Sequence, residues 1–152
     1  RAKNAGIDGL ILPDMSIEES KEYLKSARKN KLDTIFLVSP NTNNARLKKI
    51  AKASTGFLYM VAVFGTTGVQ TKIHKYTIDS IKNAKKIVSH KLPIGIGFGV
   101  STPNDVKKYV SVGVDAVIVG SANLKIIENT PSSKLQKRIT EYTKKLKRNT
   151  RL

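Results

Sequence analysis

The chain has 152 residues, which suits one ordinary domain, and 39% of them are hydrophobic, which is enough to form a core. The absence of Cys excludes disulfides, thiolate metal sites and cysteine nucleophiles. No apolar run reaches the roughly 18 to 20 residues of a membrane span. The net charge of +17 makes nucleic-acid binding a hypothesis to be weighed.

Short apolar runs rich in β-branched residues predict five strands of a parallel sheet, each covered on both faces. They are residues 7–12, 34–38, 57–63, 94–98 and 116–119. Helical patterns lie between them. Ser16 and Glu19 have the spacing of a capping box, which predicts a helix start there. Residues 102–105 (Thr-Pro-Asn-Asp) predict another helix start, and Gly113 predicts the end of that helix.

Strands that alternate with helices predict an α/β protein with a parallel sheet. A doubly wound dinucleotide-binding domain would have a glycine-rich turn after its first strand, but residues 12–14 (Leu-Pro-Asp) contain no glycine. The other candidate is the (β/α)8 TIM barrel, and about five of its eight βα units are recognisable. The chain begins with Arg1. We therefore expect residues 1–152 to form a single partial barrel domain, a C-terminal fragment whose N-terminal βα units are missing.

The lysines are spread over every helical stretch, and most of them interrupt apolar positions at helical spacing. This is the pattern of solvated helix faces. The densest basic stretch, residues 134–152, still carries an apolar stripe that includes Tyr142 and Leu146, so it predicts an amphipathic helix. Aromatic residues are not interleaved with the basic ones as a nucleic-acid stacking platform requires. Solvated faces are favoured over a nucleic-acid patch.

Glycine-rich segments follow the last two strands, at residues 95–101 and at Gly120-Ser121. Glycines let the backbone approach an anion closely, and amides at a helix start then face the anion with the favourable end of the helix dipole. Paired loops of this kind in barrels commonly hold a phosphate. Phosphate binding is favoured over two tight turns without a ligand. Residues 65–68 (Gly-Thr-Thr-Gly) fit a lid over a ligand, and a plain surface turn fits them nearly as well.

Five apolar residues could line a pocket above the barrel, although packing in the core is the favoured interpretation from the residues alone. They are Ile11, Leu37, Tyr59, Phe98 and Ile118. Asp14 lies at the end of a strand, where barrel catalysts often lie, but helix capping is favoured for it. The sequence contains no metal-binding cluster, no Ser-His-Asp arrangement and no carboxylate pair.

Several motifs, in their order along nearly the whole chain, resemble the middle and C-terminal part of the tryptophan synthase α subunit family. They are Ala5-Gly6-Ile7-Asp8-Gly9, Pro13-Asp14, Glu18-Glu19-Ser20, Val38-Ser39-Pro40-Asn41, Tyr59 with Gly65-Thr66-Thr67-Gly68, Gly97-Phe98-Gly99-Val100-Ser101, and Val119-Gly120-Ser121-Ala122 with Lys125-Ile126-Ile127-Glu128. Single motifs occur in other phosphate-binding barrels, but the ordered set is specific.

The resemblance implies a cytoplasmic lyase of tryptophan biosynthesis, a barrel that cleaves indole-3-glycerol phosphate to indole and glyceraldehyde 3-phosphate. It implies that Gly68, Gly99, Gly120 and Ser121 hold the substrate phosphate and that Thr67 belongs to the lid. It also implies that the five apolar residues surround the indole ring. The partner would be a β subunit facing residues 13–16 and 40–44, and the pyridoxal phosphate of the complex belongs to that subunit. No metal, nucleic acid or membrane is implied for this chain.

The two catalytic carboxylates of the family, a Glu and an Asp, match no residue of this sequence and are expected upstream. We therefore expect this chain alone to be inactive. The family often has an Arg where this chain has Val63, so a lid contact from that position is not implied. Two alternatives stay open: another phosphate-binding barrel of histidine or tryptophan biosynthesis, and, less favoured, a basic nucleic-acid-binding module.

Overall fold

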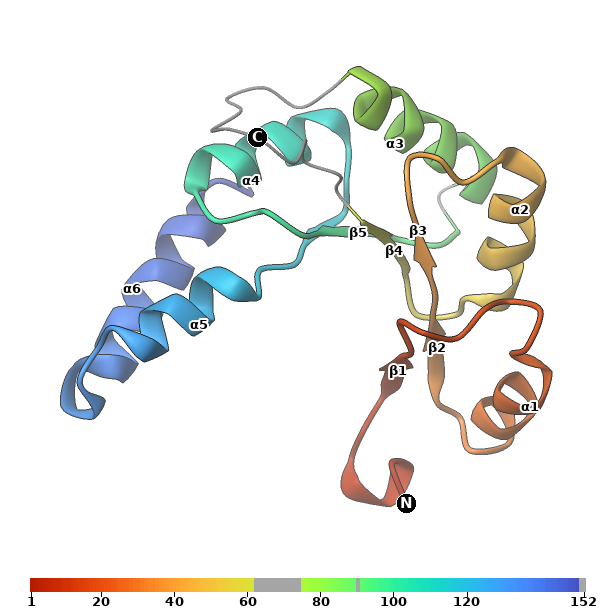
Figure 1. The fold of residues 1–152 in the computed structure, drawn as a ribbon, viewed down its shortest axis with the longest axis horizontal. Helices are drawn as coiled ribbons and strands as arrows, with labels where there is room; N and C mark the ends of the chain where they lie inside the picture. Colours follow the sequence, from red (N-terminus) through yellow and green to blue (C-terminus); the bar gives the residue numbers. More distant parts are fainter. Residues whose placement is uncertain (62–74, 90, 151–152) are drawn as a thin grey trace.

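The computed structural model describes residues 1–61, 75–89 and 91–150 of the chain, which form an open arch (Figure 1). In chain order the elements are η1 (Lys3–Ala5), β1 (Gly9–Ile11), α1 (Lys21–Lys29), β2 (Asp33–Ile35), β3 (Leu37–Val38), α2 (Asn44–Ala53), β4 (Leu58–Val61), α3 (Lys75–Val88), β5 (Ile94–Gly97), α4 (Pro103–Val112), β6 (Ala116–Val117), α5 (Ser121–Glu128) and α6 (Ser132–Arg148). Among these elements, no helix is both long and apolar enough to cross a membrane.

The strands follow one another across the sheet in the order of the sequence. β1 pairs with β2, and β3, β4, β5 and β6 form a second sheet in that order; each of these pairings is parallel. A doubly wound sheet would reverse its strand order at a switch point. Sequential parallel strands that curve into an arch are instead the arrangement of a (β/α)8 barrel, as the sequence predicted.

The predicted strand 34–38 is interrupted in the middle. Asp33–Ile35 pairs with β1 on one side, whereas Leu37–Val38 pairs with β4 on the other side. Phe36 lies between the two pairings, and its carbonyl accepts a hydrogen bond from Tyr59 N–H at 3.0 Å. The extended segment is therefore shared between two neighbours, which the apolar pattern does not reveal.

The other predicted strands are longer than the observed ones. Residues 7–12 and 116–119 shorten to β1 and β6, and the segment 94–98 ends at Gly97. Phe98 leaves the sheet because its backbone adopts a left-handed φ of 72°. The strand predicted over 57–63 begins at Leu58 and is described as far as Val61.

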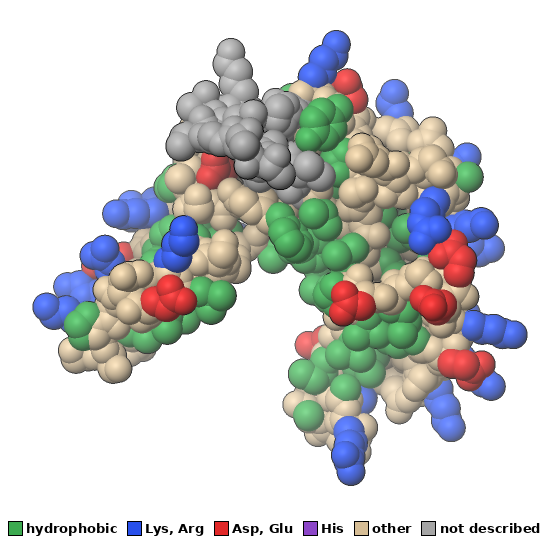
Figure 2. Space-filling view, in the orientation of Figure 1, with side chains coloured by type: hydrophobic (Ala, Val, Ile, Leu, Met, Phe, Trp, Pro, Cys, Tyr) green, Lys and Arg blue, Asp and Glu red, His purple; other side chains and the backbone are tan. Residues whose placement is uncertain are grey.

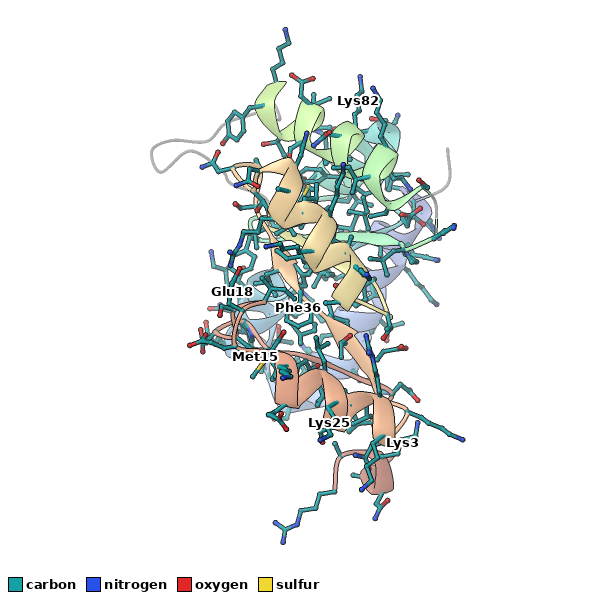
Figure 3. All side chains as sticks on the ribbon, turned by 90° about the vertical axis from the view of Figure 1, so that its right-hand side faces the viewer. Lys3, Met15, Glu18, Lys25, Phe36 and Lys82 are labelled. Carbon is teal, nitrogen blue, oxygen red and sulfur yellow. The ribbon has the colours of Figure 1, made fainter. Side chains whose placement is uncertain are left out.

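One face of the sheet packs against the helices and forms the core. Val38, Met60 and Ile96 are neighbours in this face and are buried. Phe36 belongs to the same core and meets the ring of Tyr23 from α1 edge-on, with 6.1 Å between the ring centroids. Figure 3 shows Phe36 at the level between α1 and α2. The helices therefore cover the convex side of the arch.

In Figure 1 no helix lies across the opposite, concave face of the described sheet. The expectation of strands covered on both faces holds for β5, which is buried at all four positions, but not for β1. Ile11 is 41% exposed on this side of the arch, and Leu124 of α5 is 59% exposed. Figure 2 shows hydrophobic side chains gathered along the inner side of the arch, whereas the lysines and arginines lie mostly around its outside. This distribution fits the interpretation of the positive charge as solvated helix faces.

Of the two predicted helix starts, the one at Thr102 is confirmed and the one at Ser16 is wrong. At α4 the capping box is complete: Thr102 Oγ1 accepts from Asp105 N–H at 3.1 Å, and Asp105 Oδ2 accepts from Thr102 N–H at 2.9 Å. Gly113 ends this helix with a left-handed φ of 103°, as predicted. The start predicted at Ser16 was wrong, because α1 begins at Lys21. The Ser16 hydroxyl donates to the Glu19 carboxylate at 2.6 Å, which closes a local turn instead of a helix.

Candidate functional site

An apolar wall lies on the concave face of the sheet. Leu37 and Tyr59 are direct partners in the register of β3 and β4, and Tyr59 is in turn paired with Gly95 of β5. Parallel strands place alternate residues on opposite faces, so these positions share the face that points away from the helices. The structure therefore brings Leu37 and Tyr59 together on this face, where core packing was favoured from the residues alone and a pocket lining was the alternative.

Tyr59 is the centre of a row of aromatic rings. Its ring lies 6.3 Å from that of Phe98 in an edge-to-face arrangement, and 6.2 Å from that of Phe57. Gly97 makes this possible, because a Cβ atom there would overlap the Tyr59 hydroxyl. Burial raises the pKa of the Tyr59 phenol, so it stays a neutral hydrogen-bond donor at ordinary pH. The row forms an apolar aromatic surface of the kind that accepts an aromatic ligand.

Two further predicted wall residues, Ile118 and Ile11, lie on either side of this row. Ile118 follows β6, its N–H donates to the Ile96 carbonyl at 2.7 Å, and its Cδ1 lies beside Gly95. Ile11 ends β1, opposite Ile35 of β2. Sequence reasoning missed Phe57, whose position just before β4 could have indicated the same face by its spacing of two from Tyr59.

The first glycine loop turns sharply where β5 ends. Phe98 and Gly99 both have left-handed backbones, with φ of 72° and 71°. Such a backbone is uncommon for a residue other than glycine and marks a specifically shaped turn. The chain then enters α4 through the Thr102 capping box, so the loop lies at the amino end of this helix. Amides at that end carry partial positive charge and can receive an anion.

The second glycine loop lies on the neighbouring strand. Gly120 immediately precedes α5, which begins at Ser121. A Cβ at Gly120 would meet no atom within 4 Å, so there is open space in front of this turn. Because β5 and β6 are adjacent and parallel, both loops lie at the same end of the sheet. Gly99, Gly120 and Ser121 are therefore on the side where the strands end, as expected of a phosphate-binding pair of loops.

Some predicted residues are not among those that the wall and the loops bring together. Gly68, Thr67 and Val63 lie outside the described residues. Asp14 does not cap α1, because the N-cap residue is Ser20, so the favoured interpretation of Asp14 was wrong. Asp14 instead lines a cavity of about 360 Å³, and Thr42 of the predicted β-subunit-facing region lines it too.

The electrostatics of this region come from an exposed ion pair beside that cavity. Arg46 donates to both carboxylate oxygens of Glu18, at 2.8 and 2.9 Å. Figure 3 shows Glu18 on the loop before α1, which this pair connects to α2. A backbone hydrogen bond lowers the pKa of Glu18, and Arg46 lowers it further. In the described ranges no group of three or more acidic or histidine side chains is arranged to hold a metal ion.

The fold and these loops define the class of protein: the chain forms part of a (β/α)8 barrel, with glycine turns that lead into helices at the carboxyl ends of its strands. It belongs to the tryptophan synthase alpha chain family, which it matches over residues 1–151. Relatives of similar sequence include the tryptophan synthase alpha chains of Pyrococcus abyssi, 39% identical over 145 residues and 93% of this chain, and of Carboxydothermus hydrogenoformans, 42% identical over 137 residues and 90% of this chain.

Solved structures agree with this assignment. A chain of the tryptophan synthase α2β2 complex from Pyrococcus furiosus superimposes with a TM-score of 0.85 at 35% identity, covering 95% of this chain. The chain spans only part of these proteins: 57% of the P. abyssi relative, 50% of the C. hydrogenoformans relative and 57% of the P. furiosus chain. This partial barrel thus corresponds to about half, or somewhat more, of a family member.

Proposed function

We propose that this chain supplies the substrate-binding part of the tryptophan synthase α reaction, the cleavage of indole-3-glycerol phosphate to indole and glyceraldehyde 3-phosphate. The observation that carries this proposal is a direct connection between two binding surfaces. Phe98 packs edge-on against Tyr59, and the next residue, Gly99, belongs to the turn that leads into α4. An aromatic ring and an anionic group of one small ligand can therefore be held side by side.

The residues take complementary roles in this proposal. Gly99, Gly120 and Ser121 hold the phosphate through amides and a hydroxyl, with Gly68 contributing and Thr67 acting in the lid. The indole ring lies against five apolar side chains: Ile11, Leu37, Tyr59, Phe98 and Ile118. Tyr59 is a neutral donor beside this surface, since burial raises the pKa of its phenol.

Cleavage also needs proton transfer, which positioned acid and base groups accelerate by about 10² to 10⁴-fold. None of the wall residues carries a carboxylate. We propose that the acid and the base are a Glu and an Asp from the part of the family barrel that this chain does not span. Residues 1–152 then bind the substrate but do not cleave it.

The remaining part of the barrel has a defined place to dock. β2 and β3 belong to one extended segment and count as one strand of a barrel. Together with β1, β4, β5 and β6, the described part of the chain therefore supplies five of the eight strands. We propose that three further βα units bridge the free edges of β1 and β6 and cover the concave face. The exposed Ile7 and Ile127, on opposite sides of the arch, then become buried.

The partner proposed for the completed barrel is a tryptophan synthase β subunit. A similar protein from P. furiosus is part of an α2β2 complex. The surface proposed to face the partner comprises residues 13–16 and 40–44, where Asp14 and Thr42 line the cavity beside the Arg46–Glu18 pair. This ion pair connects the loop before α1 to α2.

The test combines this chain with the three N-terminal βα units of the P. abyssi relative and follows indole release from indole-3-glycerol phosphate. We expect release only from the mixture, and substrate binding that is weakened by about tenfold or more in a Gly120→Ala variant. A Tyr23→Phe variant is the control, because it changes a tyrosine on the convex side. If the assembled mixture does not bind the substrate, the proposal is wrong. If this chain alone releases indole, the assignment of the acid and base to the other part is wrong.

A further inference from the structure

The backbone of Ser101, in the turn before α4, is held from two directions by side chains. Its N–H donates to Asp105 Oδ2 at 3.2 Å, and the same oxygen accepts from Thr102 N–H at 2.9 Å. Its carbonyl accepts a hydrogen bond from the hydroxyl of Tyr142 at 2.8 Å. Asp105 belongs to α4, but Tyr142 belongs to α6, 41 residues further along the chain than Ser101.

The Tyr142 hydroxyl is not needed for the packing of α6. The ring belongs to the apolar stripe of this helix and packs against the core together with the buried Leu146. A phenylalanine would provide the same apolar contacts. The hydroxyl instead extends to a main-chain carbonyl in the glycine loop. Burial raises the pKa of the Tyr142 phenol, and Asp105 raises it further, so this group remains a donor at ordinary pH.

We propose that Tyr142 is a positioning residue of the phosphate-binding loop, which holds the Ser101 carbonyl so that the turn through Gly99 keeps its anion-binding shape. The inference rests on the proposed function and extends it to α6, which contains none of the predicted site residues. The turn needs such support because Phe98 and Gly99 both adopt left-handed backbones, which for Phe98 is intrinsically unfavourable. Tyr142 and Asp105 hold the carbonyl and the N–H of one residue within this turn.

The test measures the affinity for inorganic phosphate in three proteins: the wild-type chain, Tyr142→Phe and Tyr23→Phe. The last is a matched control, because Tyr23 also donates its hydroxyl to a main-chain carbonyl, that of Leu10, at 3.2 Å on the other side of the arch. Phosphate binding is followed by the amide NMR signals of Gly99 and Gly120. We expect Tyr142→Phe to raise the dissociation constant by about three- to tenfold, as the loss of one supporting hydrogen bond implies, and Tyr23→Phe to leave it unchanged.

A second readout separates positioning from general stability. Without ligand, amide hydrogen exchange of residues 99–102 should be faster in Tyr142→Phe, while both variants unfold at similar denaturant concentrations. Equal phosphate affinity in Tyr142→Phe and the wild type would overturn the role of Tyr142 and leave the proposed function intact. A wild-type chain that does not bind phosphate would overturn the phosphate assignment itself, and the inference with it.

Discussion

The hydroxyl of Tyr59 occupies the space that a Cβ atom at residue 97 would need. The two residues lie on adjacent strands, and the tyrosine ring leans along β5 from its own partner Gly95 towards Gly97. The glycine is thus required by the side chain beside it, since its own φ is not in the left-handed region. The position of the ring and the absence of a side chain at residue 97 depend on each other.

Gly97→Ala should therefore displace the Tyr59 ring and destabilise the chain. Overpacking of this kind costs about 1 to 3 kcal/mol, which is measured by chemical denaturation. The displaced ring should also change the tyrosine fluorescence of the native state. Gly120→Ala is the matched comparison, because a Cβ there meets nothing within 4 Å and should cost much less stability. Equal destabilisation by the two variants would contradict the prediction.

Gly120→Ala should instead act on ligand binding. The new methyl group projects into the open space in front of α5, where the phosphate is proposed to lie. Losing one charge-assisted hydrogen bond to the anion costs about 1.5 to 3 kcal/mol, so phosphate affinity should fall by about tenfold or more. Isothermal titration with inorganic phosphate measures this change. Unchanged affinity would place the phosphate away from Gly120.

Thr102→Ala should destabilise the chain by about 1 kcal/mol, because it removes the side-chain acceptor of the α4 capping box. Thr102→Ser keeps the hydroxyl and should retain most of the stability. Thermal unfolding of the two variants provides the comparison. If Thr102→Ser loses as much stability as Thr102→Ala, the hydroxyl is not the stabilising group.

Stability should fall at high pH because of Tyr109. This side chain is 2% exposed, and burial, with further contributions from Asp105 and Tyr76, raises its pKa from 10.0 to about 12. The unfolded chain therefore loses the phenol proton at lower pH than the folded chain. The stabilising contribution is complete below pH 10 and is lost as the pH rises towards 12, by an amount on the order of 3 kcal/mol.

Denaturant unfolding measured across this pH window tests the contribution of Tyr109. Lysines also ionise in this range, so the quantity that matters is the difference between the wild type and Tyr109→Phe, which contain the same lysines. The wild type should lose stability more steeply with rising pH. Parallel curves for the two proteins would mean that Tyr109 titrates normally.

Replacing Asp115 should destabilise the chain more than replacing Lys85, its ion-pair partner. Its carboxylate accepts from Lys85 Nζ at 2.8 Å and from the main-chain N–H of Ile94 at 2.8 Å, which joins α3 and β5 to the segment before β6. Asp115→Ala leaves the Ile94 N–H unpaired and should cost about 1 to 3 kcal/mol. Lys85→Met removes only a partly exposed ion pair and should cost at most about 1 kcal/mol. The denaturation midpoints of the two variants measure these losses of stability. A larger loss in Lys85→Met than in Asp115→Ala would contradict the prediction.

The strand and helix order could be predicted because each element carries a local signal. The apolar runs located the strands, and the α4 start was found because Thr102 and Asp105 lie at the spacing that capping requires. The same signal failed at Ser16, where the side chains of Ser16 and Glu19 bond to each other and close a turn before the helix. The spacing of the two residues does not reveal which of these arrangements forms.

The position of the glycine loops was predictable, because glycines just after strands are a local signal in the sequence. Gly99 and Gly120 do lie in turns at the same end of two adjacent strands, and their role in holding a phosphate stays a prediction. Tyr142 could not be identified in the same way, because it is an ordinary member of an apolar pattern. Only the fold shows that it donates its hydroxyl to Ser101. For Phe57, the spacing of two from Tyr59 indicates the same face, but only the fold shows that the two rings are neighbours.

The division of the extended segment 33–38 between two neighbours has a geometric consequence. Its first half is bonded to β1 and its second half to β4, so the hydrogen-bonded zone moves forward along the chain from one strand to the next. Strands whose hydrogen-bonded residues shift in this way must tilt to stay paired with both neighbours, so the sheet cannot remain flat. Strand tilt and stagger together determine the diameter of a closed barrel. Phe36 lies where the pairing changes, so in the proposed complete barrel the backbone at this residue would contribute to the stagger between neighbouring strands.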